Sequence, residues 1–290
     1  MGEPMTMRSD AVRCLHPGGL HRMAYTDWGA RDNPNVVVCV HGLTRNGRDF
    51  DRLAQALESR FRVVCPDIVG RGKSDWLPTH HGYQFPQYVA DCVTLLARLG
   101  VERVAWVGTS MGGLIGMMIA AMADPPIRCL VVNDVGPAVS RAGLERIARY
   151  AGAQTAFDSF EAAVDYVAQI SSTFGPLSRD DWRELTRHVV TEKDGRWRFH
   201  YDEAIGRATR EAMAQKVAPD IWPMWNAITV PTLVLRGAES DFLEAETARQ
   251  MTTRGPRAKL VEFEGVGHAP SLLPADQIGA IRDFLLQNEE

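Results

Sequence analysis

A short stretch, residues 103–113 (R-V-A-W-V-G-T-S-M-G-G), holds the serine whose surroundings best suit chemistry. Its first residues are apolar and partly β-branched, which is typical of a strand buried on both faces. A turn of the pattern G-x-S-x-G follows, and the run from Leu114 to Met122 then predicts a buried helix. Because such a turn holds the serine hydroxyl exposed at the end of a sheet, we predict that Ser110 is a nucleophile. The alternative is a glycine-rich turn that serves only close packing.

A serine hydroxyl is a weak nucleophile near neutral pH and needs a base, which in turn needs an orienting carboxylate. His268 follows the last predicted strand in a glycine-rich segment, so it is the predicted base, the alternative being a surface loop histidine. We predict Asp241 as the carboxylate, because it follows the predicted strand Val230–Leu235 and keeps the chain order Ser…Asp…His. Asp134, which follows an earlier strand, is the alternative, since Asp241 could be only the N-cap of the next helix.

Acyl transfer also needs N–H donors for the negative charge that develops on the carbonyl oxygen. The backbone N–H of Met111, directly after the serine, is the first predicted donor. The segment H-G-L-T at residues 41–44 leaves another buried strand, and the N–H of Leu43 is the second predicted donor. His41 is expected to hold this loop by a hydrogen bond rather than to transfer protons.

The elements around these residues alternate between strands and helices, which predicts a parallel sheet with crossover helices. The predicted strands are 11–15, 22–28, 35–40, 61–65, 103–108, 127–132, 230–235 and 259–263, and the predicted helices between them are 50–59, 87–99, 114–122, 244–252 and 277–286.

The alternation stops after Pro137, and from there to about residue 226 the pattern is helical with almost no strand. The candidate helices are 140–150, 159–171, 179–191 and 203–215. We therefore predict a sheet core over 1–137 and 227–290 and a helical cap, or lid, over 138–226. Trp222 and Trp225 are the predicted pocket walls, although packing inside the cap is the simpler interpretation of any single tryptophan.

Composition limits the partners. The formal net charge is −4 and no basic block occurs, which argues against nucleic acid and anionic membranes as partners. The five cysteines form no C-x-x-C pair, so we expect reduced thiols, a cytoplasmic protein, and neither metal nor cofactor. The glycine-punctuated loop 67–74 lacks the spacing of a phosphate loop and is interpreted as a structural turn.

Taken together, these motifs resemble the α/β-hydrolase superfamily over residues 22–286, apart from the cap. The motifs are His41-Gly42, Asp67-x-x-Gly70-x-Gly72-x-Ser74, Gly108-Thr109-Ser110-Met111-Gly112-Gly113, Asp241 and Gly267-His268. The resemblance implies a mostly parallel central sheet flanked by helices, with a helical cap insertion. It also implies a serine hydrolase whose triad is Ser110, Asp241 and His268 and whose oxyanion donors are Leu43 and Met111.

Within the superfamily, Ser110 stands where haloalkane dehalogenases and epoxide hydrolases have Asp, and H-G-L-T replaces the H-G-G-G of lipases. The sequence Thr44-Arg45-Asn46 departs from the pattern usual in C–C bond hydrolases. We expect a carboxylesterase, monomeric or homodimeric, that cleaves small to medium, largely apolar esters through an acyl-enzyme. The alternatives are a lactonase, thioesterase, amidase, perhydrolase or C–C bond hydrolase on the same triad, a lyase, and a non-catalytic ligand-binding protein.

Overall fold

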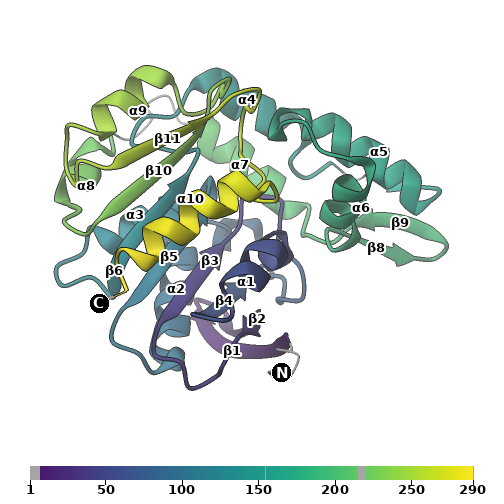
Figure 1. The fold of residues 1–290 in the computed structure, drawn as a ribbon. Coiled ribbons are helices and arrows are strands. Elements are labelled where there is room, and N and C mark those ends of the chain that lie inside the picture. Colours follow the sequence, from purple (N-terminus) through teal and green to yellow (C-terminus); the bar gives the residue numbers. More distant parts are fainter. Residues whose placement is uncertain (1–6, 154, 215–219, 290) are drawn as a thin grey trace.

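The computed structural model describes residues 7–153, 155–214 and 220–289. Within these residues eight strands form one sheet in the order β1-β2-β4-β3-β5-β6-β10-β11 (Figure 1). The bounds are β1 Arg8–His16, β2 Gly19–Trp28, β3 Val36–Val40, β4 Arg62–Pro66, β5 Val104–Thr109, β6 Ile127–Asn133, β10 Thr232–Gly237 and β11 Lys259–Phe263. β2 pairs antiparallel with β1 and with β4, and the other pairs are parallel. The predicted mostly parallel sheet is confirmed.

Helices cover both faces of this sheet because its central strands are apolar on both sides. In β3 every residue is buried, and alternate side chains enter two separate clusters, Val37 in one and Val38 in the other. Helices α1 (Asp51–Leu57) and α10 (Ala275–Leu286) pack on the first face. The second face carries α2 (Phe85–Leu99), α3 (Met111–Ala120), α8 (Trp222–Ala227) and α9 (Ala245–Met251). Figure 1 shows α10 crossing the near face of the sheet.

Residues 138–226, which we call the inserted segment, lie between β6 and β10 in the chain, and their middle part, residues 156–199, extends away from the sheet (Figure 1). The four predicted helices are present there, as α4 (Arg141–Tyr150), α5 (Phe160–Ile170), α6 (Arg179–Arg187) and α7 (Ala204–Met213). A short 3₁₀ helix, η3, spans Ser172–Phe174. The end predicted for the fourth helix, residue 215, lies outside the described residues.

The prediction of almost no strand in this segment is wrong. Strands β7 (Ala156–Phe157), β8 (Val190–Lys193) and β9 (Arg196–Phe199) form a small sheet in the order β7-β9-β8. Asp194 and Gly195 join β8 to β9 with φ of 53° and 71°, the left-handed conformation that a two-residue hairpin turn needs. The Asp-Gly pair between two alternating runs was the signal, and it explains why the helix predicted over 179–191 ends at Arg187.

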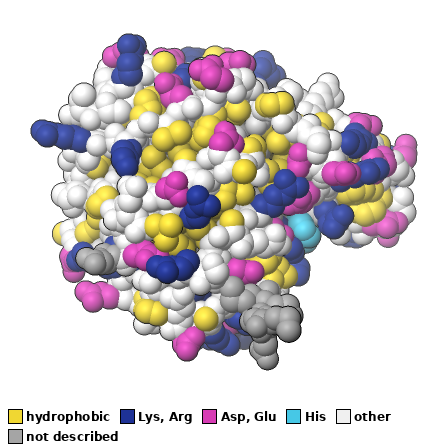
Figure 2. All heavy atoms as spheres, viewed as in Figure 1, with side chains coloured by type: hydrophobic (Ala, Val, Ile, Leu, Met, Phe, Trp, Pro, Cys, Tyr) yellow, Lys and Arg dark blue, Asp and Glu magenta, His cyan; other side chains and the backbone are white. Residues whose placement is uncertain are grey.

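Charged side chains of both signs gather on the inserted segment (Figure 2). Several form ion pairs between α5 and α6: Glu161 accepts hydrogen bonds from Arg179 at 2.6 Å and from Arg183 at 2.9 Å. These pairs are exposed and each adds little stability. Hydrogen bonds join the segment to loops between the elements of the sheet core: Asn46 donates to the carbonyl of His188 at 2.7 Å, and Tyr83 donates to Asp202 at 2.5 Å.

Two further expectations concern side chains of the core. The loop 67–74 is held by the carboxylate of Asp67, which accepts the N–H groups of Gly47 at 2.9 Å and Lys73 at 2.8 Å, as a structural turn requires. All five cysteines are buried. No helix in the described ranges has the length and apolar character needed to cross a membrane.

Candidate active site

Ser110 lies in the sharp turn between β5 and α3, as predicted, and it has the uncommon φ of 52°. The turn brings backbone segments so close that side chains are excluded on both sides of the serine. A Cβ on Gly108 would lie 2.2 Å from the carbonyl oxygen of Gly112, and one on Gly112 would lie 2.0 Å from that of Val40. The glycines of the G-x-S-x-G pattern are therefore a steric requirement of the turn.

His268 reaches this serine from the loop after β11. Its Nε2 lies 3.0 Å from Ser110 Oγ, and its Nδ1 lies 2.8 Å from Oδ2 of Asp134. All three side chains are buried, and the ring of Phe242 stacks on the imidazole with centroids 4.2 Å apart. The structure thus brings together the predicted Ser110 and His268 in hydrogen-bonding geometry.

The prediction of Asp241 as the orienting carboxylate is corrected by the structure, which brings Asp134 to the imidazole instead. β6 pairs directly with β5, so Asp134, the residue after β6, lies beside Ser110. Oδ1 of Asp134 accepts the N–H of Gly237 at 2.9 Å, and Oδ2 accepts the hydroxyl of Ser240 at 2.5 Å. The predicted alternative is therefore the residue that contacts His268.

The carboxylate of Asp241 bonds to the inserted segment and not to the imidazole. Its neighbour Ser240 donates its hydroxyl to Asp134 instead. The backbone carbonyl of Asp241 accepts a hydrogen bond from the hydroxyl of Ser140. Its carboxylate accepts two hydrogen bonds from Arg146, at 2.6 and 2.7 Å. These hydrogen bonds lower the pKa of Asp241 against the opposing effect of burial.

The segment after β3 lies against the serine. A Cβ on Gly42 would be 3.9 Å from that of Ser110, and Leu43 lines the same cavity. No described residue accepts a hydrogen bond from the N–H of Leu43 or from that of Met111, the first residue of α3. A helix leaves its first N–H groups without intrahelical partners, which accounts for Met111, whereas Leu43 lies in the loop between β3 and Gly47.

His41 holds this segment, as expected from the sequence. Its Nδ1 bonds to the carbonyl of Gly42 at 2.7 Å, and its Nε2 accepts the N–H of Ile68 at 3.0 Å. The ring is fully buried, and burial lowers the pKa of His41 to about 3. A neutral ring with both nitrogens occupied has no free position for proton transfer.

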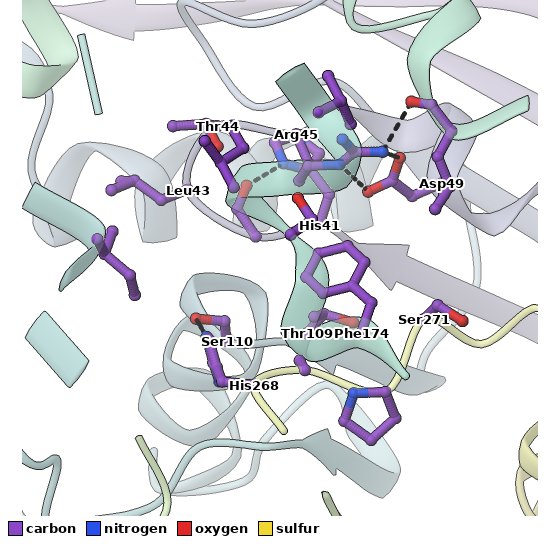
Figure 3. A pocket seen from close by; sticks show the side chains of 18 of the residues that line it. His41, Leu43, Thr44, Arg45, Asp49, Thr109, Ser110, Phe174, His268 and Ser271 are labelled. Carbon is purple, nitrogen blue, oxygen red and sulfur yellow. Dashed lines mark hydrogen bonds and ion pairs between the residues drawn. The ribbon is translucent and has the colours of Figure 1, made fainter. Parts of the chain in front are cut away.

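A cavity of about 70 Å³ adjoins Ser110 and His268. Figure 3 shows Ser110, Leu43, Arg45 and Phe174 around it. Nine of its 23 lining residues come from the inserted segment, and these are mostly apolar, with Arg146 as the charged one. The lining from that segment is Arg146, Ile147, Tyr150, Val167, Ile170, Ser171, Phe174, Leu185 and Phe199.

The prediction that Trp222 and Trp225 form pocket walls is wrong. Trp225 is fully buried where α8 packs near α3, and its Nε1 donates to the carbonyl of Arg254 at 3.1 Å. The guanidinium of Arg254 lies over the ring of Trp222, 3.7 Å from its centroid. Both rings pack on the sheet core, because α8 returns the chain to β10 and does not cover the strand ends.

Two clusters outside the cavity have metal-ligating residue types. Cys14, His21 and Asp91 form a buried cluster, and His80, His81 and Glu211 form one at the surface. His21 bonds to Asp91 at 2.9 Å, and burial raises the pKa of Cys14 to about 12, which keeps the thiol protonated. His80 bonds to Glu211 at 2.9 Å. In each cluster the carboxylate is thus bonded to a histidine, and the absence of a metal stays a prediction.

The fold and the serine turn define the class of protein. Residues 37–280 match the sequence model of the alpha/beta hydrolase family, so the chain belongs to that family and is a hydrolase.

Similar proteins fall within the same class. The 3-hydroxybutyrate-oligomer hydrolase of Cupriavidus necator is 47% identical over 281 residues, which cover 94% of this chain and 96% of that protein. The 2-(acetamidomethylene)succinate hydrolase of Mesorhizobium japonicum is 26% identical over 86% of this chain and 87% of its own length. A solved alpha/beta hydrolase from Novosphingobium aromaticivorans superposes with a TM-score of 0.85 at 36% identity, covering 96% of this chain and 98% of its own.

Proposed function

We propose that this chain is a serine ester hydrolase that works through an acyl-enzyme. The observation that supports this most strongly is the continuous chain of hydrogen bonds from Asp134 through His268 to Ser110, at 2.8 and 3.0 Å. A hydroxyl, an imidazole and a buried carboxylate in this order are the parts that acyl transfer to a serine requires.

In the proposed reaction Ser110 Oγ attacks the ester carbonyl while His268 Nε2 takes the hydroxyl proton. Asp134 accepts the Nδ1–H and stabilises the imidazolium that forms. The N–H groups of Leu43 and Met111 bind the oxyanion, and His268 then protonates the departing alcohol. Water, activated by the same imidazole, hydrolyses the acyl-enzyme, so that one ester and one water give one acid and one alcohol.

We further propose that the substrates include short esters of 3-hydroxy acids. The name of the Cupriavidus relative, 47% identical over nearly the whole chain, supports this choice of class. The inserted segment would then act as a cap that selects the substrate, because much of the cavity lining belongs to it. All three proposed catalytic side chains lie outside this segment, and one copy of the chain supplies them all.

A fluorophosphonate probe and a 3-hydroxybutyrate trimer test the proposal together. We expect the phosphonyl group on Ser110 by peptide mass spectrometry, and release of monomer from the trimer. Ser110→Ala should abolish both, whereas Ser178→Ala, which changes the exposed N-cap of α6, should retain both. Labelling at another residue, or turnover that survives Ser110→Ala, would refute the assignment. Parallel assays with a lactone and a thioester separate the other hydrolase activities.

A further inference from the structure

Two arginines line the cavity beside the proposed nucleophile, although apolar substrates were expected from the sequence. Arg45 comes from the segment after β3 and Arg146 from α4 of the inserted segment. Their side chains are 11% and 22% exposed, so both guanidinium groups are largely withdrawn from bulk water. Charges in such surroundings interact more strongly with a ligand than charges at an open surface.

In both arginines an aspartate binds the Nε and Nη2 edge of the guanidinium. Arg45 donates from Nε and Nη2 to Asp49 at 2.7 and 2.6 Å, and Nη2 also donates to the carbonyl of Leu185 at 2.8 Å (Figure 3). Arg146 donates from Nε and Nη2 to Asp241 at 2.6 and 2.7 Å. In both cases Nη1 donates to no aspartate and to no backbone carbonyl of the described residues.

Two arginines and one aspartate line the cavity wall, and each arginine is paired with one carboxylate. Arg45, Arg146 and Asp49 line it, whereas Asp241 does not. Tyr150 adds a hydroxyl on the same wall; burial raises the pKa of Tyr150, against the opposing positive charges of Arg146 and Arg45, and so keeps the hydroxyl protonated. Arg146 and Tyr150 also hydrogen-bond to each other through their side chains. Toward a ligand, the two guanidinium groups and the tyrosine O–H are therefore the hydrogen-bond donors of this wall.

We propose that Arg45, Arg146 and Tyr150 form a subsite that binds a carboxylate of the substrate, so that the favoured substrates are esters carrying a free carboxylate near the scissile bond. This inference rests on the proposed ester hydrolysis and specifies its substrate class. Guanidinium groups suit the task because they stay charged and form strong, directional hydrogen bonds to carboxylate oxygens. Asp49 and Asp241 are positioning residues, since both carboxylate oxygens of each are bonded to the arginine that it holds.

An ester of a hydroxy acid has such a carboxylate on its alcohol portion. After attack by Ser110 the leaving group would then be a hydroxy acid, whose carboxylate the arginines hold while His268 protonates its oxygen. The subsite would thus orient the leaving group as well as bind it, and orientation of this kind contributes directly to the rate.

A pair of matched esters measures the preference. 3-Acetoxybutanoate and 3-acetoxybutanamide have nearly the same shape and differ in one charge. We expect wild type to favour the carboxylate in kcat/KM by roughly ten- to a hundredfold, the range of one or two charge-assisted hydrogen bonds. Arg146→Met should remove most of this ratio, mainly through KM, and Arg146→Lys should restore part of it. Arg141→Met, at a 91% exposed position of the same helix, is the matched control and should keep the wild-type ratio.

Binding to an inactive variant separates this proposal from the proposed function. Calorimetry on Ser110→Ala should detect 3-hydroxybutyrate but not 3-hydroxybutanamide, and adding Arg146→Met should weaken the first at least tenfold. Equal handling of acid and amide in both experiments would overturn the subsite even if esters are hydrolysed. Arginine-dependent binding in a protein that hydrolyses no ester would instead overturn the proposed function and leave the subsite in place.

Discussion

Replacing Asp134 with Asn tests the proposed catalytic site most directly. The carboxylate accepts three hydrogen bonds: Oδ1 takes the N–H of Gly237, and Oδ2 takes the hydroxyl of Ser240 and faces Nδ1 of His268. An asparagine has one oxygen and one NH2 group in place of the two oxygens, so it can orient in only two ways.

The two orientations differ in what their partners can do. If the amide oxygen faces His268, the NH2 group meets the N–H of Gly237, which cannot become an acceptor, and a buried donor costs about 1–3 kcal/mol when unpaired. If the NH2 group faces His268, the imidazole can change tautomer and accept it. The strain then falls on Ser240, whose oxygen already accepts the N–H groups of Phe242 and Leu243, but its hydroxyl proton can rotate whereas the N–H of Gly237 is fixed. We therefore expect the second orientation, in which the proton of His268 moves to Nε2 and points at Ser110.

An imidazole protonated on Nε2 cannot accept the proton of Ser110. We expect kcat for p-nitrophenyl butyrate to fall about 10³- to 10⁴-fold, the loss known for the equivalent change in serine proteases. This corresponds to about 4–5.5 kcal/mol of activation free energy. The fold should persist, because Asn tolerates the left-handed φ of 55° that Asp134 adopts.

The matched control is Asp124→Asn, because Asp124 also has a left-handed φ, of 49°, but its side chain is 87% exposed. It should retain full activity. Asp241→Asn should lower kcat on this neutral ester less than tenfold, since its carboxylate contacts Arg146 rather than the imidazole. A variant at residue 134 that retains more than a tenth of wild-type kcat, with a thousandfold loss at residue 241, would show that the assignment from geometry is mistaken.

Three further predictions concern the scaffold. Gly112→Ala should lower the free energy of unfolding in urea by at least about 3 kcal/mol, because its Cβ would meet the carbonyl of Val40 at 2.0 Å, whereas Gly279→Ala, with no atom within 4 Å, should not destabilise; equal effects would contradict this. The pKa of His41 is lowered from 6.5 to about 3, so the unfolded chain binds more protons than the folded chain between these pH values. The free energy of unfolding should therefore be at its full value above pH 6.5 and fall by about 1.4 kcal/mol per pH unit below it. The variant His41→Gln should reduce this slope. Trp225→Phe should lower the free energy of unfolding by about 1–2 kcal/mol, because the hydrogen bond of the indole N–H is lost, while kcat/KM stays within twofold. A raised KM would instead indicate that Trp225 contacts the substrate.

The sheet was predictable from the sequence because its signals are local. Runs such as residues 36–40 are short, apolar throughout and mostly β-branched, and they are bounded by turn residues, which favours a strand buried on both faces. The serine turn was equally visible, since the close approach at Gly108 and Gly112 leaves a fixed spacing in the sequence. The hairpin at Asp194-Gly195 was missed because helical spacing on either side was given more weight than its two turn residues.

The choice between Asp134 and Asp241 could not be made from the sequence. Both follow predicted strands, and chain order admits either. The decision depends on which neighbour, Ser240 or Asp241, faces inward from one loop, and on the position of Arg146 in a helix about a hundred residues earlier in the chain. The prediction for Trp222 and Trp225 was wrong for a related reason. The sequence showed large apolar rings, but it did not show that α8 packs on the sheet.

The positions of the five buried cysteines allow local unfolding of this chain to be followed by thiol alkylation. Cys14, Cys39, Cys65, Cys92 and Cys129 are buried in β1, β3, β4, α2 and β6, and burial raises the pKa of Cys129 to about 11. Iodoacetamide can therefore alkylate these thiols only when the elements that hold them become exposed to solvent. Since no cysteine follows residue 129, alkylation would not detect a movement confined to the inserted segment. Comparing alkylation with amide exchange would accordingly distinguish local opening of the sheet core from motion of the segment that lines the cavity beside Ser110.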